Sequence, residues 1–265
     1  MSSSMQRALG VIPARIGSTR FPRKPLAKIG GREMILRTLD RARGCRLLDE
    51  IWVATDCEDI RKVVEDDGGH AVMTSKHCKT GTDRIVEALK TKGYTQSDAG
   101  HSFPWGAIVN IQGDEPLLPS SNIDMCLEHF FAEEKTSNVD IATLVTPIRT
   151  LEDFQDKNIV KCVVDESDYA LYFSRAQIPY HVSNTSGQAL DALRHIGIYV
   201  YRPERLYEFI HLKSRHLERL ESLEQLRALE ANWRIKTIKI EEHDSPGIDT
   251  PEQLEDIERR FFPGH

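Results

Sequence analysis

The chain has 265 residues, of which 40% are hydrophobic and 29% charged, and its formal net charge is −6. This composition is typical of a globular protein; it excludes an intrinsically disordered chain and argues against a protein that holds nucleic acid on a basic face. The five cysteines are widely spaced without a CxxC pair. They indicate neither a zinc site nor a disulfide framework, and a reducing cytoplasm is expected.

The length allows one large domain or two small ones, and the absence of a clear linker favours a single domain over residues 1–265. The start MSSSMQR lacks the apolar segment of a signal peptide, so residues 1–9 are expected to form a disordered leader. No apolar run approaches the roughly 20 residues of a membrane-spanning helix.

Apolar runs alternate with helical periods over the first 165 residues. Strands are predicted at residues 8–14, 50–56, 71–75, 105–116 (where the strand ends in a turn), 141–147 and 160–164, and helices from residue 35, at 82–90 and at 123–131. The runs are continuously apolar and do not alternate with polar residues. This βαβα order therefore predicts a mostly parallel sheet with helices on both faces, and ligands bind such sheets beyond the carboxyl ends of the strands.

The remaining chain is less regular. YALYFSRAQIPYH and RHIGIYVYR are predicted strands, and a helix with leucine at every third position is predicted from Leu217 to Leu229. Steps of three fall short of the helical turn, so these leucines drift around the helix, which favours burial on more than one side, including against a partner subunit. RIKTIKIEE predicts a late strand, and DTPEQLEDIERR predicts a helix with Pro251 near its first position.

A basic stretch, ARIGSTRFPRK, follows the first predicted strand. It places Arg15, Arg20 and Lys24 in a loop that Gly17, Pro22 and Pro25 bend and stiffen. Guanidinium groups and backbone amides suit a polyphosphate, although a solvated surface loop has the same composition. Neither a Walker A motif nor a GxGxxG after a strand occurs, which disfavours ATPase and NAD-binding functions.

Two aspartates lie where predicted elements meet. Asp114, in QGDEP, ends the fourth predicted strand, and Asp249, in GIDTPEQL, precedes the last predicted helix. Either carboxylate would suit Mg²⁺ beside a phosphate. Taken alone, Asp114 is more typical of an ordinary turn, and Asp249 of a helix N-cap, a role that Thr250 could serve as well.

The polar groups of the other motifs suit either ligand binding or an ordinary structural role. MTSKHCKTGTDR has the hydroxyls, glycine and arginine of a nucleotide pocket but also the residues of a turn. Arg175, after an aromatic strand, suits either a carboxylate ligand or a structural ion pair. His195 fits a packed strand histidine, and Glu224 and Gln225 fit a helix surface.

Together and in this order, IPARIGSTRFPRKPL, VATD, MTS…TGTDR, VNIQGDEP, YFSRAQIP, RHIGIY, LEQLR and IDTPEQLE resemble the 3-deoxy-manno-octulosonate (Kdo) cytidylyltransferases, or CMP-Kdo synthetases, over residues 10–259. The resemblance implies a Rossmann-like α/β nucleotidyltransferase with a smaller sugar-binding and dimerisation lobe at about residues 165–230. It also implies that CTP and Kdo give CMP-Kdo and pyrophosphate with Mg²⁺, in a cytoplasmic homodimer that supplies lipopolysaccharide synthesis. An enzyme for sialic acid or an amino-substituted Kdo, and a non-catalytic nucleotide-binding protein, are the alternatives.

Carried over motif by motif, the resemblance also implies the site residues. Arg15, Ser18, Arg20 and Lys24 would bind the CTP phosphates, with Arg15 and Lys24 catalytic. Asp114 and Asp249 would be catalytic and ligate Mg²⁺. The cytidine and phosphate pocket would contain Thr74, Ser75, Gly81, Thr82 and Arg84, and the sugar acid would contact Gln112, Arg175, His195, Glu224 and Gln225. The chain departs from the family pattern at Arg23, where glycine is usual, and at Asp83, where glutamate is often found.

Overall fold

The computed structural model of the protein describes residues 7–17, 21–95, 103–134, 139–181, 191–241 and 247–264. Its strands are β1 (Ala8–Ala14), β2 (Lys28–Ile29), β3 (Arg32–Glu33), β4 (Glu50–Thr55), β5 (His70–Met73), β6 (Ala107–Ile111), β7 (Ile141–Pro147), β8 (Lys161–Val164), β9 (Ala170–Ser174), β10 (Leu193–Tyr201) and β11 (Ile235–Lys239). Its helices are the 3₁₀ turn η1 (Lys24–Leu26), α1 (Met34–Arg43), α2 (Glu58–Asp66), α3 (Gly81–Thr91), α4 (Ser120–Glu134), α5 (Leu151–Gln155), α6 (Pro203–His211), α7 (His216–Glu221), α8 (Leu226–Glu230) and α9 (Pro251–Phe261).

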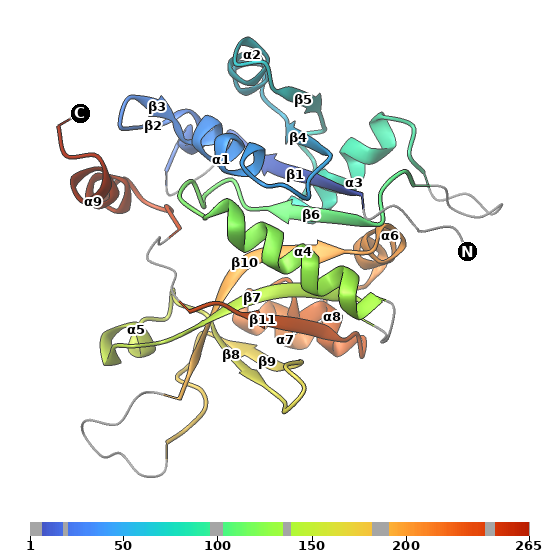
Figure 1. Cartoon of the computed structure of the whole chain (residues 1–265), viewed down its shortest axis with the longest axis vertical. Coiled ribbons are helices and arrows are strands. Elements are labelled where there is room, and N and C mark those ends of the chain that lie inside the picture. The colour runs from blue at the N-terminus through green and yellow to red at the C-terminus, as the bar shows by residue number, and fades with distance from the viewer. Residues whose placement is uncertain are drawn as a thin grey trace.

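The main sheet has the strand order β11-β7-β10-β6-β1-β4-β5 (Figure 1). Pairing is parallel from β6 through β1 and β4 to β5, and again between β7 and β11. Strand β10 runs antiparallel to both of its neighbours, β6 and β7. The prediction of a mostly parallel α/β sheet is confirmed, with β10 as the reversed strand.

Helices cover both faces of the sheet because β1 is apolar on both sides. Ala8 and Ile12 lie in one core cluster with residues of α1, α2 and α4. Leu9 and Val11 lie in a second cluster with residues of α3, α6 and α8. A strand buried on both faces lies inside the molecule, so the chemistry of this fold is left to the loops at its ends.

Two expected boundaries need correction. The disordered leader was expected to reach residue 9, but Ala8 and Leu9 already belong to β1 and are fully buried. The range 165–230 is not wholly separate from the sheet, because β10 is one of the sheet's inner strands. Outside the main path lie β8 and β9, which pair with each other, and β8 also pairs with β10; α7 and α8 come later in the chain, after β10 and α6 (Figure 1).

The prediction of a single leucine-rich helix from Leu217 to Leu229 is wrong. The chain forms α7 and α8, and Ser222 ends α7 in the left-handed conformation at φ 52°. Leu223 and Leu226 are buried, whereas Leu220 is 69% exposed. A continuous helix with a step of three would turn some leucines away from the core, and the break lets the second half pack.

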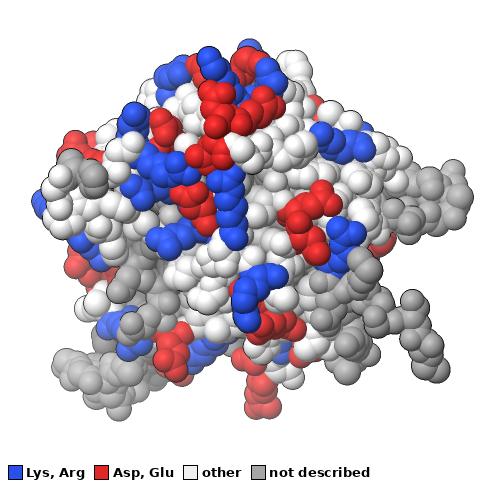
Figure 2. All heavy atoms as spheres, turned by 45° about the horizontal axis from the view of Figure 1, so that its top comes forward, with Lys and Arg blue, Asp and Glu red and all other residues white. Residues whose placement is uncertain are grey.

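Acidic and basic side chains are interspersed on the face shown in Figure 2. This mixed surface agrees with the modest net charge of −6. Among the described residues, no helix combines the length and the apolar character that crossing a membrane requires.

Candidate active site

A cleft of about 610 Å³ lies at the carboxyl ends of β1 and β6. The loop after β1, the turn η1, the start of α3, the loop after β6 and the residue that precedes Thr250 all line it. It brings together seven of the predicted site residues: Arg15, Lys24, Gly81, Arg84, Gln112, Asp114 and Asp249. Ser18 and Arg20 lie outside the described residues.

Two glycines let the walls of the cleft close tightly on the end of β1. A Cβ atom added to Gly81 would lie 3.1 Å from Cγ of Pro13, and one added to Gly113 would lie 3.1 Å from the carbonyl oxygen of Pro13. Both contacts are shorter than ordinary van der Waals packing. Gly81 therefore brings the first turn of α3 to the cleft, and Gly113 does the same for the loop after β6.

The N-terminus of α3 is built to begin at the cleft. The Thr80 hydroxyl accepts a hydrogen bond from the amide of Asp83 at 3.1 Å, and the Asp83 carboxylate accepts one from the amide of Thr80 at 3.2 Å. This reciprocal cap works with aspartate in place of the family's usual glutamate. The remaining amides and the positive end of the helix dipole favour an anion in the cleft.

Lys24 joins the two aspartates of the cleft. Its ammonium group donates to the carboxylates of Asp114 and Asp249 at 3.1 Å each, and to the carbonyl of Ile248 at 2.9 Å. The Lys24 side chain is only 15% exposed. Asp249 does not cap α9, because the Thr250 hydroxyl accepts from the amide of Gln253 and takes that role. Its carboxylate is thereby directed to Lys24.

The residue before Lys24 takes a conformation that suits glycine. Arg23 has φ 57° and ψ 24°, the left-handed region. A residue with a Cβ costs about 1 kcal/mol there. The departure from the family pattern therefore leaves the loop's path possible but strained, and the Arg23 guanidinium pairs with Asp59 of α2 at 2.8 Å.

Arg84 is held by a buried acid that the sequence analysis did not single out. Its guanidinium donates to Asp56 at 3.0 Å, and the two side chains are 3% and 9% exposed. Asp56 also accepts from the amide of Ile16 at 3.3 Å, which ties the basic loop to the same pair. Its signal was available: Asp56 ends the VATD motif directly after β4.

Thr74 and Ser75 support Arg84 and are not part of the cleft lining. The Thr74 hydroxyl accepts from Arg84 at 2.6 Å and donates to the carbonyl of Thr55 at 3.0 Å. The Ser75 carbonyl accepts from Arg84 at 3.4 Å, while its hydroxyl accepts from the amide of His77. Both residues therefore act on the cleft through the arginine.

Thr82 and Glu224 meet on the sheet side of α3. The Thr82 hydroxyl donates to one carboxylate oxygen of Glu224 at 3.1 Å. The other oxygen has no hydrogen-bond partner among the described residues but lies 3.8 Å from the Arg227 guanidinium, which forms an ion pair with it. Burial raises the pKa of Glu224. This carboxylate is thus held between Thr82 and Arg227, and its side chain is still 30% exposed.

His195 lies deep in the fold on β10. Its Nε2 atom lies 3.0 Å from the Thr143 hydroxyl, and its ring packs edge-on to Phe173 at 4.9 Å between centroids. Burial lowers its pKa to about 3, with Arg194 adding to the effect. The imidazole is therefore neutral at ordinary pH and serves as a hydrogen-bonding group.

Arg175 and Gln225 lie away from the lining of the cleft. The Arg175 guanidinium donates to the carbonyls of Glu221 at 2.8 Å and Lys157 at 3.1 Å. Gln225 is buried, 5% exposed, just before α8. By contrast Gln112 lines the cleft, and its amide donates to Asn110 at 3.4 Å.

Cys78 also lines the cleft, next to Lys79 and Thr80, none of which was predicted as a site residue. Burial and a hydrogen bond to Glu87 raise the pKa of the Cys78 thiol to about 12. The thiol stays protonated at neutral pH and is a poor nucleophile. The site thus offers cations, carboxylates and helix amides to a charged ligand.

A parallel α/β sheet with basic groups, a helix N-terminus and paired carboxylates at its carboxyl edge defines a class of proteins that bind nucleotide phosphates. The model of the cytidylyltransferase family matches residues 9–240. The chain belongs to this family, and within it to the 3-deoxy-manno-octulosonate cytidylyltransferases.

Relatives and a solved structure support this membership. The 3-deoxy-manno-octulosonate cytidylyltransferase of Thermodesulfovibrio yellowstonii is 44% identical over 255 residues, covering 94% of this chain and 96% of the relative. That of Desulfatibacillum aliphaticivorans is 42% identical over 248 residues, covering 94% and 96%. The structure of CMP:2-keto-3-deoxy-manno-octonic acid synthetase complexed with CTP has a TM-score of 0.83 at 35% identity and covers 96% of this chain and 98% of its own.

Proposed function

We propose that the protein transfers CMP from CTP to Kdo, releasing pyrophosphate. The observation that carries this proposal is the 44% identity, over 94% of the chain, to a curated 3-deoxy-manno-octulosonate cytidylyltransferase. The cleft supports it with cationic groups beside paired carboxylates. The similarity of the whole chain to a synthetase solved with CTP favours CTP as the nucleotide.

In this reaction the hydroxyl at the anomeric carbon of Kdo attacks the α-phosphorus of CTP. A bond forms between that oxygen and phosphorus, the bond to the bridging oxygen breaks, and its electron pair leaves with pyrophosphate. The hydroxyl proton passes to solvent. Arg15, Arg20 and Lys24 would neutralise the departing pyrophosphate, and Ser18 and the first amides of α3 would bind phosphate oxygens. No covalent enzyme intermediate is required, because positioning and electrostatics suffice for phosphoryl transfer.

Mg²⁺ is proposed as the metal, with Asp114 and Asp249 as its protein ligands. The donor set fits, because two carboxylates from distant parts of the chain already converge on one cation, the Lys24 ammonium. Mg²⁺ prefers oxygen ligands and commonly uses one or two carboxylates together with substrate phosphates. When bound, the ion would stabilise negative charge on the phosphate.

For the sugar acid we propose Gln112, Arg175, His195, Glu224 and Gln225. The neutral His195 and the Glu224 carboxylate, which Thr82 and Arg227 hold in place, support hydrogen bonding to sugar hydroxyls. Thr82 links Glu224 to α3, and thereby links the sugar side to the nucleotide cleft. Arg175 would have to exchange its carbonyl partners for the Kdo carboxylate.

We also propose a cytoplasmic homodimer that activates Kdo for lipopolysaccharide synthesis. The homodimer is supported by exposed leucines in and after the β8–β9 pair, among them Leu171 at 59% and Leu220 at 69%. Burial of these two side chains against a second copy of the chain would remove apolar surface from water.

The test is pyrophosphate release from CTP with each of three acceptors: Kdo, 8-amino-Kdo and sialic acid. We expect release only when Kdo and a divalent metal are both present. Faster turnover with either other acid would reassign the sugar, and CTP binding without turnover on any acceptor would favour the non-catalytic nucleotide-binding function. Equal turnover with ATP would contradict the nucleotide assignment.

A further inference from the structure

The helix after Asp249 packs on a small hairpin that follows Lys24. Figure 1 places α9 beside β2 and β3, at the edge of the molecule. Ile248 and Ile257 are fully buried in a cluster of their own with Ile29 and Met34, and Phe262 packs against it. The two walls of the proposed metal site therefore share one small core, separate from the two large ones.

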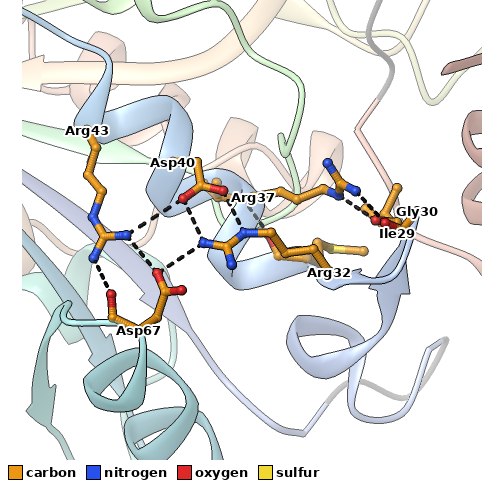
Figure 3. A network of polar contacts seen from close by, with 9 residues as sticks. Ile29, Gly30, Arg32, Arg37, Asp40, Arg43 and Asp67 are labelled. Carbon is orange, nitrogen blue, oxygen red and sulfur yellow. Dashed lines mark hydrogen bonds and ion pairs between the residues drawn. The ribbon is translucent and has the colours of Figure 1, made fainter. Parts of the chain in front are cut away.

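Three polar contacts close this packing. The Glu258 carboxylate accepts from the amide of Gly30 at 2.9 Å. The Arg37 guanidinium donates to the carbonyls of Ile29 and Gly30 and lies 4.0 Å from the centroid of the Phe262 ring (Figure 3). The fit is tight, because a Cβ atom on Gly30 would lie 2.6 Å from Phe262. We call these contacts the hairpin clasp.

The hairpin is in turn fixed to the body of the protein. Arg32 of β3 donates to Asp40 of α1 at 2.7 Å and to Asp67, which caps α2, at 3.0 Å (Figure 3). Arg43 of α1 donates to the same Asp67 at 2.7 Å. The hairpin is thus a rigid support between the helices α1 and α2 on one side and α9 on the other.

The support reaches the site through a short path. Ile248 is fully buried, and its amide donates to the carbonyl of Asp114 at 2.9 Å. Asp249 comes next, with its amide bound to the Gln253 side chain inside the first turn of α9. A shift of α9 along the hairpin would therefore carry the Asp249 carboxylate away from Asp114.

We propose that Glu258 is a positioning residue for the metal site, acting through α9 on Asp249 with Arg37 and Phe262 as its partners in the hairpin clasp. The inference rests on the proposed role of Asp249 as a metal ligand. Glu258 itself does not line the cleft, nine residues along the chain from Asp249. Glu258 affects the position of the Asp249 carboxylate. Its loss is therefore expected to weaken metal binding more than it lowers kcat at saturating metal.

The experiment measures Mn²⁺ binding by electron paramagnetic resonance in the presence of CTP and the absence of Kdo. Glu258→Ala is expected to weaken Mn²⁺ binding about 10-fold or more, the size typical of losing a group that orients a metal ligand. Glu258→Gln keeps an oxygen that accepts from Gly30 and is expected to bind like the wild type. Glu255→Ala is the matched control, an exposed glutamate on the same helix.

Raising Mg²⁺ should restore kcat in Glu258→Ala, which a general loss of stability would not allow. If Glu258→Ala does not fold by circular dichroism, Phe262→Leu decides by the same measurement. Wild-type Mn²⁺ affinity in the folded variant overturns the positioning role. Asp249→Asn separates the positioning role of Glu258 from the proposed role of Asp249 as a metal ligand. Weaker Mn²⁺ binding in Asp249→Asn together with normal binding in Glu258→Ala would contradict the role of Glu258 alone. Normal Mn²⁺ binding in Asp249→Asn would contradict the metal site itself.

Discussion

Lys24 and Asp249 are 225 residues apart in the chain, yet in the cleft the Nζ atom of Lys24 lies 3.1 Å from Oδ1 of Asp249. The lysine bridges Asp249 to Asp114, so the side chain that we propose for phosphate binding holds the two carboxylates that we propose as metal ligands. A nucleotide that attracts the ammonium would free both carboxylates. Phosphate binding and metal binding are then coupled through one residue.

The first prediction concerns this coupling. Lys24→Met should bind Mn²⁺ more tightly than the wild type when CTP is absent, because the internal cation no longer competes. The same variant should lose CTP affinity by about 1.5–3 kcal/mol, the usual contribution of one charged hydrogen bond. Calorimetric titrations with each ligand measure both. Lys28→Met, at a largely exposed lysine of β2, is the control. Unchanged or weaker Mn²⁺ binding in Lys24→Met would contradict the competition.

A second prediction concerns the carboxylates. Asp114→Asn and Asp249→Asn should each abolish most of kcat and leave the fold intact, because asparagine keeps the shape but not the charge that Mg²⁺ requires. CTP affinity should suffer less than turnover. If both bind one ion, the double variant should be little worse than either single one, since groups acting as a unit are non-additive. The measurement is kcat across a Mg²⁺ titration. Near-normal kcat at saturating Mg²⁺ in either variant would show that the replaced aspartate is not a catalytic metal ligand and has only a structural role in its turn.

The main strands of the cleft are predictable because burial leaves a simple pattern. β1 and β6 are largely apolar runs that stop at polar turns, and the structure places both turns in the cleft. The Lys24–Asp249 pair is not predictable from pattern, because periodicity identifies the buried face of an element and not its partner. The reversed direction of β10 was missed for the same reason, since an apolar run carries no polarity.

Local exceptions account for the other differences. Ser222 adopts a left-handed conformation that only the packed fold selects, so a run of leucines gave no sign of the break between α7 and α8. Helix α2 buries only Ile60 and Val64 in an otherwise charged segment, too weak a signal for a predicted helix. Asp56 could have been predicted as a site residue from the sequence, because an aspartate directly after an apolar strand lies at the ligand-binding edge of the sheet.

The third prediction concerns the stability of the Asp56–Arg84 pair. Asp56→Asn should lower the free energy of unfolding by about 3 kcal/mol, because it leaves a buried guanidinium without its counter-charge. Denaturation in urea measures the loss. Asp59→Asn is the control, since Asp59 pairs with Arg23 at 2.8 Å but both side chains are 60% exposed and solvent screens them. An equal decrease in the free energy of unfolding in Asp56→Asn and Asp59→Asn would show that burial does not strengthen the Asp56–Arg84 pair.

The fourth prediction concerns pH. His195 has a pKa of about 3 when folded, whereas an unfolded histidine titrates near 6.5. Between these values the unfolded chain binds the extra proton, so folding stability falls as pH falls. From pH 7 to pH 5 this group should cost about 2 kcal/mol. His195→Gln cannot titrate and should lose that much less stability over the same interval, whatever its stability at pH 7. Parallel pH profiles for the two proteins would show that His195 is not buried as a neutral ring.

The last prediction concerns assembly. The wild type should scatter light as a particle of about twice the chain's 30.2 kDa at micromolar concentration. Leu220→Glu and Leu171→Glu place a charge on side chains that are 69% and 59% exposed in the single chain, so each should cost little in the monomer and prevent a dimer that buries it. Leu151→Glu, on α5 and 58% exposed, makes the same change outside the segments proposed for dimerisation and should leave the mass unchanged. A wild-type mass of one chain would refute the homodimer, and loss of the dimer in Leu151→Glu alone would move the interface to α5.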